Sequence, residues 1–221
     1  MRRLLPVILV VILAIALVIY YSLSNVKESP PAKLTGMPWQ IDILPDGHSK
    51  VFGLIPGKTT LREAIAVLGT DYEMAIVESK TSTSLEMYFS DYHAGPLAAK
   101  LVLAAKTDPG DLQQWKQRAI KKDYMGSANA KKYLLATADR DAALNSVLRA
   151  IAFIPAVNLD DDIVRKRFGD PEEKIGAVQG VTYYLYPKQG LSITLSPKAK
   201  EVLQYVAPPD FASLRAPLQS N

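Results

Sequence analysis

The chain offers few side chains that could activate a nucleophile or a water molecule. It contains no cysteine and only two histidines, His48 and His93. The absence of cysteine excludes a thiolate nucleophile, a disulfide, a thiolate metal site and a lipidated cysteine. Any Ser-His-Asp or histidine-metal site has to use one of the two imidazoles. His93 follows Ser90 and Asp91, but neighbours on one loop rarely converge on one substrate atom, so the sequence favours a loop histidine.

The segment GLIPGKTT at 53–60 approximates a phosphate-binding loop. Such a loop needs successive backbone N–H groups, a lysine for the phosphates and a hydroxyl for magnesium. Gly53 and Gly57 enclose three residues where the motif needs four, and one of the three is Pro56, which has no N–H to donate. The sequence therefore favours a turn and a helix cap, and we expect no nucleotide and no cofactor.

Two groups of carboxylates are the remaining candidates for chemistry. A calcium site is suggested by the run Asp160, Asp161 and Asp162. The segment lacks, however, the alternating oxygen ligands and the later bidentate glutamate of an EF-hand loop. Acidic residues at a helix start already interact with the helix dipole. Glu78 and Glu86 stay open as a pair for glycoside hydrolysis, although nothing around them distinguishes them from a solvated strand face. No metal site is predicted.

The most hydrophobic segment lies at the N-terminus, where 18 of the 20 residues at 4–23 are apolar. A helix of about 20 residues spans the roughly 30 Å hydrocarbon core of a bilayer. Arg2 and Arg3 precede it and favour an N-terminus inside. We therefore predict a signal anchor at 1–23 and a single-pass inner (cytoplasmic) membrane protein whose globular domain is periplasmic or otherwise extracytoplasmic. The alternative is a cleaved secretory signal, for which 22–24 is a poor site.

The charge of the chain excludes one class of partner. The net charge is +4, and because Arg2 and Arg3 are two of the 26 basic residues, the remainder carries 24 basic and 22 acidic residues. That balance is not the footprint of a nucleic-acid-binding protein. Lys116, Lys121 and Lys122 are candidates for contact with anionic lipid headgroups, and a solvated helix surface is the alternative.

Periodicity and turn residues predict an α+β fold in which an N-terminal transmembrane helix precedes two related helix-plus-antiparallel-sheet units with a helical insertion. In the insertion, Leu144, Val147, Leu148 and Ile151 form an i, i+3, i+4, i+7 stripe that predicts a helix from about 139 to Pro155. The predicted divisions are a linker at 24–37, a first unit at 38–107, the insertion at 108–157, a second unit at 158–211 and a loose tail at 212–221.

The two units repeat a helix pattern at the same spacing. Thr60 lies nine residues before Gly69, and Asp160 lies nine before Gly169, so each pair can cap and terminate a short helix. Three strands are expected after the first helix and four after the second, and the second strand of each set is aromatic. A tandem duplication explains the repeat, and convergence on ordinary helix-to-strand patterns is the alternative.

The pattern G-x-T-x-x-x-[AV]-x-x-x-[LF]-G-[TD]-[PD], present as GKTTLREAIAVLGTD at 57–71 and partly as DDDIVRKRFGDP at 160–171, resembles the SmpA/OmlA (BamE-type) envelope lipoproteins. It also resembles the tandem-repeat β-lactamase-inhibitor proteins of the same helix-plus-sheet fold. The resemblance covers roughly 57–104 and 158–206. The chain differs from these families in three respects: it has no cysteine to carry a lipid, its predicted anchor is a helix, and it has an extra threonine at 57–60. The resemblance implies an extracytoplasmic protein-binding module.

These observations predict a membrane-anchored extracytoplasmic protein-binding or envelope-scaffold module without catalytic activity. Its partners would be another envelope protein and, through 4–23, the lipid bilayer. The candidate binding residues are Trp39, Tyr88 and Tyr184, because aromatic side chains anchor protein interfaces when exposed. The alternative for both tyrosines is a place in the core beneath the helices. The alternative function is an extracytoplasmic hydrolase acting on cell-wall or glycan material.

Overall fold

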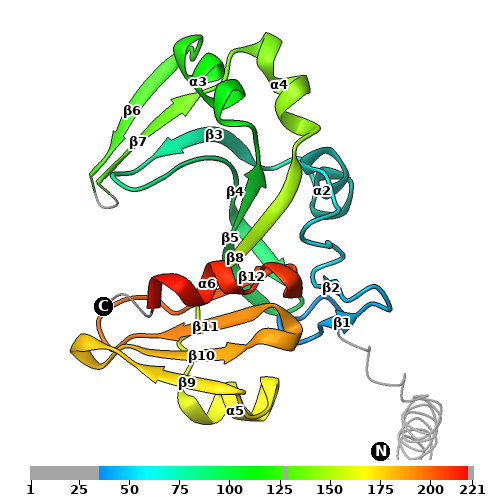
Figure 1. The fold of residues 1–221 in the computed structure, drawn as a ribbon, viewed down its shortest axis with the longest axis vertical. Helices are drawn as coiled ribbons and strands as arrows, with labels where there is room; N and C mark the ends of the chain where they lie inside the picture. The colour runs from blue at the N-terminus through cyan, green and yellow to red at the C-terminus, as the bar shows by residue number, and fades with distance from the viewer. Residues whose placement is uncertain (1–34, 127–128, 219–221) are drawn as a thin grey trace, which may run out of the picture. The chain divides into compact units, whose positions relative to one another are not determined.

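The computed structural model describes residues 35–126 and 129–218, which belong to one compact unit (Figure 1). The strands are β1 (Asp42–Ile43), β2 (Ser49–Lys50), β3 (Glu73–Glu78), β4 (Thr83–Ala94), β5 (Leu97–Lys106), β6 (Lys121–Met125), β7 (Ala130–Leu134), β8 (Val147–Pro155), β9 (Glu173–Gly176), β10 (Thr182–Tyr186), β11 (Leu191–Leu195) and β12 (Val202–Val206). The helices are α2 (Leu61–Leu68), α3 (Pro109–Gln117), α4 (Thr137–Leu144), α5 (Asp161–Phe168) and α6 (Ala212–Arg215), and short 3-10 turns include η3 (Pro187–Gln189) and η5 (Ala216–Leu218).

One antiparallel sheet runs through the molecule in the order β6-β7-β3-β4-β5-β8-β12-β11-β10-β9. Its order is symmetric about the pairing of β8 with β12: α2 precedes β3, β4, β5 and β8, while α5 precedes β9, β10, β11 and β12. Each half is therefore one helix followed by four strands. The hairpin β6-β7, which interrupts the first half between β5 and β8, extends the sheet beyond β3.

The two predicted capped helices are confirmed as α2 and α5. The Thr60 hydroxyl accepts a hydrogen bond from the backbone N–H of Glu63, and the Glu63 carboxylate accepts one from the backbone N–H of Thr60. The two bonds form a capping box. In the second half, Asp160 accepts from the backbone N–H of Ile163. Gly69 and Gly169 end the helices at φ of 96° and 81°, a backbone region that glycine enters without a steric penalty.

The larger core lies on one face of the sheet, beneath α2, α3, α4 and α5. Side chains of these helices, among them Leu61, Trp115, Ala143 and Val164, share one buried cluster with sheet residues. Successive strand residues point to opposite faces of a sheet. Apolar side chains on the second face are therefore buried only where another segment packs over them. Over the second half α6 is that segment and forms a smaller cluster with Leu185 and other residues of β10 and β12.

The predicted fold class and localisation are wrong. No helix within 35–126 or 129–218 is long and apolar enough to cross a membrane, which contradicts the prediction of a signal anchor and a single-pass membrane protein. The segment 4–23, to which the prediction assigned the transmembrane helix, lies outside the described residues, as does most of the predicted linker. The part described is mainly β-structure organised in one large sheet.

The predicted helical insertion is also wrong. One helix was expected from about residue 139 to Pro155, but α4 ends at Leu144 and β8 occupies Val147–Pro155. The pairing of β5 with β8 contains a register shift: Ala104 pairs with Ala150, but the next residue, Ala105, pairs with Leu148. The bulge adds one residue between Leu148 and Ile151, so a strand acquires the i, i+3 apolar spacing of a helix.

The predicted loose tail is ordered where the structure describes it. Residues 212–218 form α6 and η5. Leu214 and Leu218 pack on buried Leu185, Val206 and Phe211. Burial of these apolar side chains against the sheet holds the segment in place.

Candidate functional site

In one half of the sheet, one face has no helix from residues 35–126 or 129–218 over it. The side chains of Glu86, Tyr88, Val102, Ala104 and Ala152 are half-buried there. The register places Tyr88 opposite Val102 and Val102 opposite Ala152, so the three form a row across β4, β5 and β8. We call this surface the open face.

A hollow of about 310 Å³ lies on the open face. It is bounded by strands β4, β5, β8 and β12, and by Ser213 and Leu214 of α6. Its lining combines small side chains, including Ala104, Ala150 and Ala152, with the polar side chains of Glu86, Arg149 and Gln204. Small residues on a strand leave room above the backbone, so another chain can approach the sheet closely.

The sheet register shows what covers the equivalent position in the second half. Glu73 pairs with Tyr88, and in the second half Glu173 pairs with Leu185. Leu185 is fully buried beneath α6, whereas Tyr88 is half-buried. The C-terminal segment thus covers one of two equivalent surfaces, and the described part of the chain leaves the other open.

Tyr184, predicted as an exposed partner of Tyr88, is 2% exposed and points to the opposite face. In register Tyr184 lies opposite Lys174, and Met87 lies opposite Met74 at the corresponding place in the first half. The two predicted tyrosines are therefore not equivalent. Sequence alternation alone missed this because it does not fix which face each strand turns to the core.

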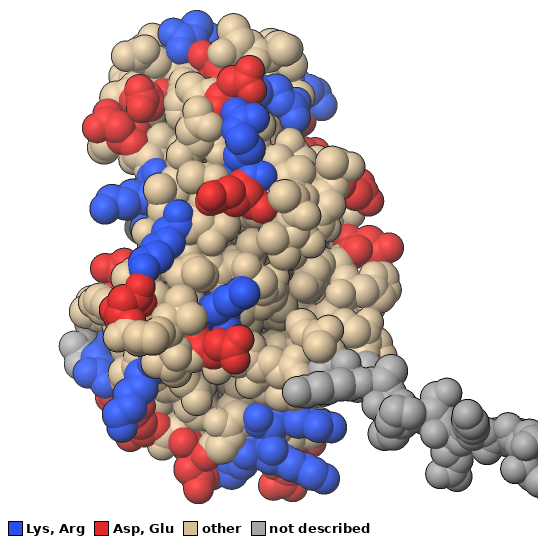
Figure 2. Space-filling view, turned by 90° about the vertical axis from the view of Figure 1, so that its right-hand side faces the viewer, with Lys and Arg blue, Asp and Glu red and all other residues tan. Residues whose placement is uncertain are grey.

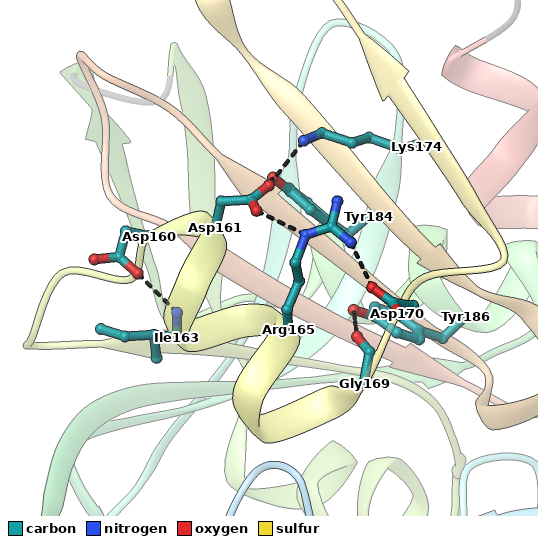
Figure 3. A network of polar contacts seen from close by, with 9 residues as sticks. All are labelled: Asp160, Asp161, Ile163, Arg165, Gly169, Asp170, Lys174, Tyr184 and Tyr186. Atoms are coloured by element: carbon teal, nitrogen blue, oxygen red, sulfur yellow. Dashed lines mark hydrogen bonds and ion pairs between the residues drawn. The ribbon is translucent and has the colours of Figure 1, made fainter.

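Tyr184 belongs to a polar network that joins α5 to β9 and β10 (Figure 3). Asp161 accepts from Lys174 Nζ at 2.8 Å, from Arg165 Nε at 2.7 Å and from the Tyr184 hydroxyl. These donors, Lys174 first, hold the pKa of Asp161 well below its usual range. Tyr186 donates to the carbonyl of Gly169 at 3.0 Å, and burial raises the pKa of Tyr186 to about 12.

The network predicts a pH-dependent stability. Asp161→Asn should lower the melting temperature at pH 7, because an amide cannot form the ion pairs with Lys174 and Arg165. A carboxylate with a lowered folded-state pKa stabilises above its ordinary pKa of about 3.9, and this contribution is lost as the pH falls through the folded value. Melting curves from pH 7 to 2 should therefore show the gap between wild type and variant closing below about pH 4.

Asp162→Asn is the matched control for that experiment. Asp162 occupies the same first turn of α5 but makes no hydrogen bond or ion pair with the described part of the chain. Its replacement should change the melting temperature much less. Equal effects of the two substitutions would mean that the helix dipole, and not the network, accounts for the contribution of Asp161.

Trp39, the third predicted anchor, is half-buried on the face opposite the open face. Its indole contacts the edge of Phe168, with ring centroids 6.3 Å apart, and the Arg167 guanidinium lies 4.7 Å above it. The structure thus separates the predicted anchors. Only Tyr88 is on the open face.

The lysines predicted to contact lipid are engaged with neighbouring residues. Lys116 pairs with Glu78, and Lys121 pairs with Asp123 at 2.9 Å. Lys122 lies 5.4 Å from the centroid of the Tyr133 ring.

The other sequence candidates also have structural contacts. Lys58 of the segment resembling a phosphate loop pairs with Asp46, whose pKa this contact lowers to about 2. His48 lies beside the same carboxylate, 3.1 Å away, and His93 lies 3.7 Å from Asp91. Asp160 caps α5, as described above.

Glu78 and Glu86 cannot flank one glycosidic bond. Glu78 shares the face of Ile76, two residues earlier on β3, whereas Glu86 lies opposite Ala75 on the other face. Glu78 accepts from Lys116 and from the Tyr133 hydroxyl, and both contacts lower its pKa. Glu86 accepts from Ser84 at 2.6 Å.

Within 35–126 and 129–218, no group of three or more histidine and carboxylate side chains is arranged to hold a metal ion. Comparison with protein families, curated proteins and solved structures finds no match to this chain. The similarity to SmpA/OmlA and β-lactamase-inhibitor proteins stays a prediction from short motifs.

Proposed function

We propose that the protein is a binding module whose open face holds the apolar side of a short amphipathic helix from another protein. The observation that carries this proposal is the unequal cover of two equivalent surfaces. Leu185 lies beneath α6, while its counterpart Tyr88 has no helix of the described chain above it.

The C-terminal segment indicates the chemistry of the partner. It contacts the sheet through Phe211, Leu214 and Leu218, which follow an i, i+3, i+7 spacing and so form one apolar stripe on a helix. The open face offers apolar contacts from Val102, Ala104 and Ala152, and Glu86, Arg149 and Gln204 beside them can pair with the polar side of such a helix. An amphipathic helix in an apolar groove is a recurring mode of protein recognition.

Tyr88 is the residue best placed to anchor the partner. Its ring is half-buried beside Val102, and tyrosine combines a large apolar contact area with a hydroxyl that can bind at the rim of an interface. Aromatic anchors of this kind contribute much of the affinity of protein interfaces. Tyr88→Ala should therefore weaken binding at least tenfold, which corresponds to about 1.4 kcal/mol.

Site-directed photocrosslinking tests the proposal in the cells that make the full-length protein. A photoreactive amino acid at position 88 or 102 should give a discrete crosslink, and its tryptic peptide should contain apolar residues at helical spacing. Position 124 is the matched control, because Tyr124 is another strand tyrosine, 66% exposed on β6 and away from the open face.

Val102→Arg should abolish the crosslink from position 88. The substitution places a long charged side chain on a half-buried surface position, so the melting temperature should change little. Crosslinking that survives this substitution, or that occurs equally at position 124, would contradict the proposal. Hydrolysis of a glycan substrate by the purified chain would favour the alternative function instead.

A further inference from the structure

A second pocket, of about 330 Å³, lies beside α5 on the sheet face opposite the open face. Most of its lining is apolar, and it includes the aromatic rings of Trp39, Phe153 and Phe168. Two lining residues, Val157 and Ile163, are large apolar side chains with exposed fractions of 48% and 39%. We call this the α5 pocket.

The α5 pocket has a positively charged rim. Lys166 and Arg167 line it, and no aspartate or glutamate does. Within the described chain neither cation pairs with a carboxylate, whereas the preceding Arg165 is paired with both Asp161 and Asp170. Figure 2 shows Lys and Arg side chains, with Asp and Glu among them, at the lower end of the molecule, the end at which Figure 1 places α5.

The contact between Arg167 and Trp39 leaves Arg167 able to bind an anion. Its guanidinium carbon lies 4.7 Å from the centroid of the indole ring. A cation over an aromatic face is attracted by the ring, while the N–H groups of a guanidinium donate in its own plane. Within the described residues Arg167 makes no hydrogen bond or ion pair, so its N–H donors are available to a ligand.

Asn158 adds a neutral donor to the same lining. Its side-chain oxygen accepts from Lys200 Nζ at 2.8 Å. Because an ammonium can only donate, this contact fixes the oxygen toward Lys200 and leaves the amide NH₂ as a donor. Two cations, one amide donor and an apolar interior define a site for an anion that carries a hydrophobic group.

We propose that the α5 pocket binds a small apolar carboxylate of the medium-chain fatty acid type. The carboxylate would lie between Lys166 and Arg167, where bidentate pairing with the guanidinium is available. The alkyl chain would lie against Trp39, Phe153 and Phe168. The volume is at the low end of the roughly 300–1,000 Å³ typical of ligand pockets, which favours a single short chain. The site and the open face are on opposite sides of the sheet, so the two proposals are independent.

Tryptophan fluorescence provides a direct titration. The chain has two tryptophans, and the second, Trp115 of α3, is buried in the core. In a full-length Trp115→Phe background, whose folding is first checked by thermal melting, Trp39 is the only indole. Sodium decanoate below its micelle concentration should produce a saturable change in Trp39 emission. The uncharged decanol should bind about tenfold more weakly, because it lacks the charge that Lys166 and Arg167 recognise.

Three variants separate the parts of the site. Arg167→Gln should weaken decanoate binding about tenfold and leave decanol nearly unchanged. Lys80→Gln removes the same charge at the exposed β3–β4 turn and should change neither. Ile163→Trp, read by calorimetry, adds bulk at a partly exposed lining position and should abolish binding of both ligands without unfolding the chain.

Several results would overturn the proposal. One is an emission change that does not saturate, and another is binding that Ile163→Trp leaves intact. Equal binding of decanoate and decanol would show that the cations do not select the ligand. A decanoate affinity that falls as protein concentration rises would show that a second copy of the chain occupies the pocket.

Discussion

Gly190→Ala is expected to destabilise the protein by about 3 kcal/mol or more, because left-handed strain and a steric clash act at the same residue. Gly190 has φ of 68° and lies in the turn between β10 and β11. A Cβ atom there would lie 2.1 Å from the carbonyl oxygen of Val206. This oxygen belongs to the backbone at the end of β12, so it cannot move away as a flexible side chain would.

The clash would also disturb the strand pairing around the turn. Val206 donates its backbone N–H to the Gly190 carbonyl at 2.9 Å, so any shift that relieves the contact weakens this hydrogen bond. Single-domain stabilities are commonly about 5–15 kcal/mol, and the expected loss is a large share of that. Chemical denaturation of the full-length chain, followed by circular dichroism, measures it.

Gly47→Ala is the matched control for the Gly190 experiment. Gly47 has φ of 83°, but no atom lies within 4 Å of the position that its Cβ would take. The substitution should therefore cost only the left-handed strain, about 1 kcal/mol. Equal losses for the two variants would show that the contact with Val206 is relieved by a small movement of the chain.

Local signals in the sequence predicted the short helices correctly. The Thr60 and Glu63 pair, the Asp160 cap and the two terminating glycines act within a few residues, so they can be read without knowledge of the fold. The seven strands predicted after these helices also appear as β3–β5 and β9–β12. How the strands join into one sheet depends on the pairing of β8 with β12, which no local pattern specifies.

The apolar spacing was misleading where the fold departs from regular strand geometry. The bulge in β8 converted alternating burial into the spacing of Leu148 and Ile151. It therefore produced a false helix, and the insertion was assigned to the wrong class of structure. A strand interpretation would have used Phe153 and Pro155, which are buried at period two after Ile151.

The open face was harder to predict than the core. Its apolar part consists of alanine and valine, residue types that occur in any apolar strand. Their partial exposure follows from the absence of a helix above them in the described chain. The prediction paired Tyr88 with Tyr184, but Tyr184 is buried and belongs to the Asp161 network. Only the register shows that Leu185 is the equivalent position.

The second large effect is expected at Tyr205, a completely buried residue of β12. Its ring contacts the edge of Phe52, with centroids 5.6 Å apart, and its hydroxyl donates to the Pro38 carbonyl at 2.9 Å. Burial raises its pKa well above the ordinary value. Tyr205→Ala should cost about 3–5 kcal/mol, because it leaves a cavity beside Phe52 and Phe153.

Tyr205→Phe isolates the contribution of the hydroxyl. It keeps the ring and removes one hydrogen bond, leaving the Pro38 carbonyl without that donor, so the expected cost is about 1–2 kcal/mol. Both values come from urea unfolding of the full-length chain. If phenylalanine and alanine at position 205 destabilise equally, the ring contributes little and the packing argument is wrong.

The same pair of variants tests whether Tyr205 holds the N-terminal hairpin on the sheet. Phe52, which follows β2, stacks on Phe153 of β8 at 5.3 Å, so the hairpin has an aromatic contact that does not depend on Tyr205. Hydrogen exchange in Tyr205→Phe should therefore increase around residues 38–41 while residues 51–54 stay protected. Tyr205→Ala should expose both segments, because loss of the ring removes the packing beside Phe52 as well. Unchanged exchange at 38–41 in Tyr205→Phe would show that the hydroxyl does not hold this segment.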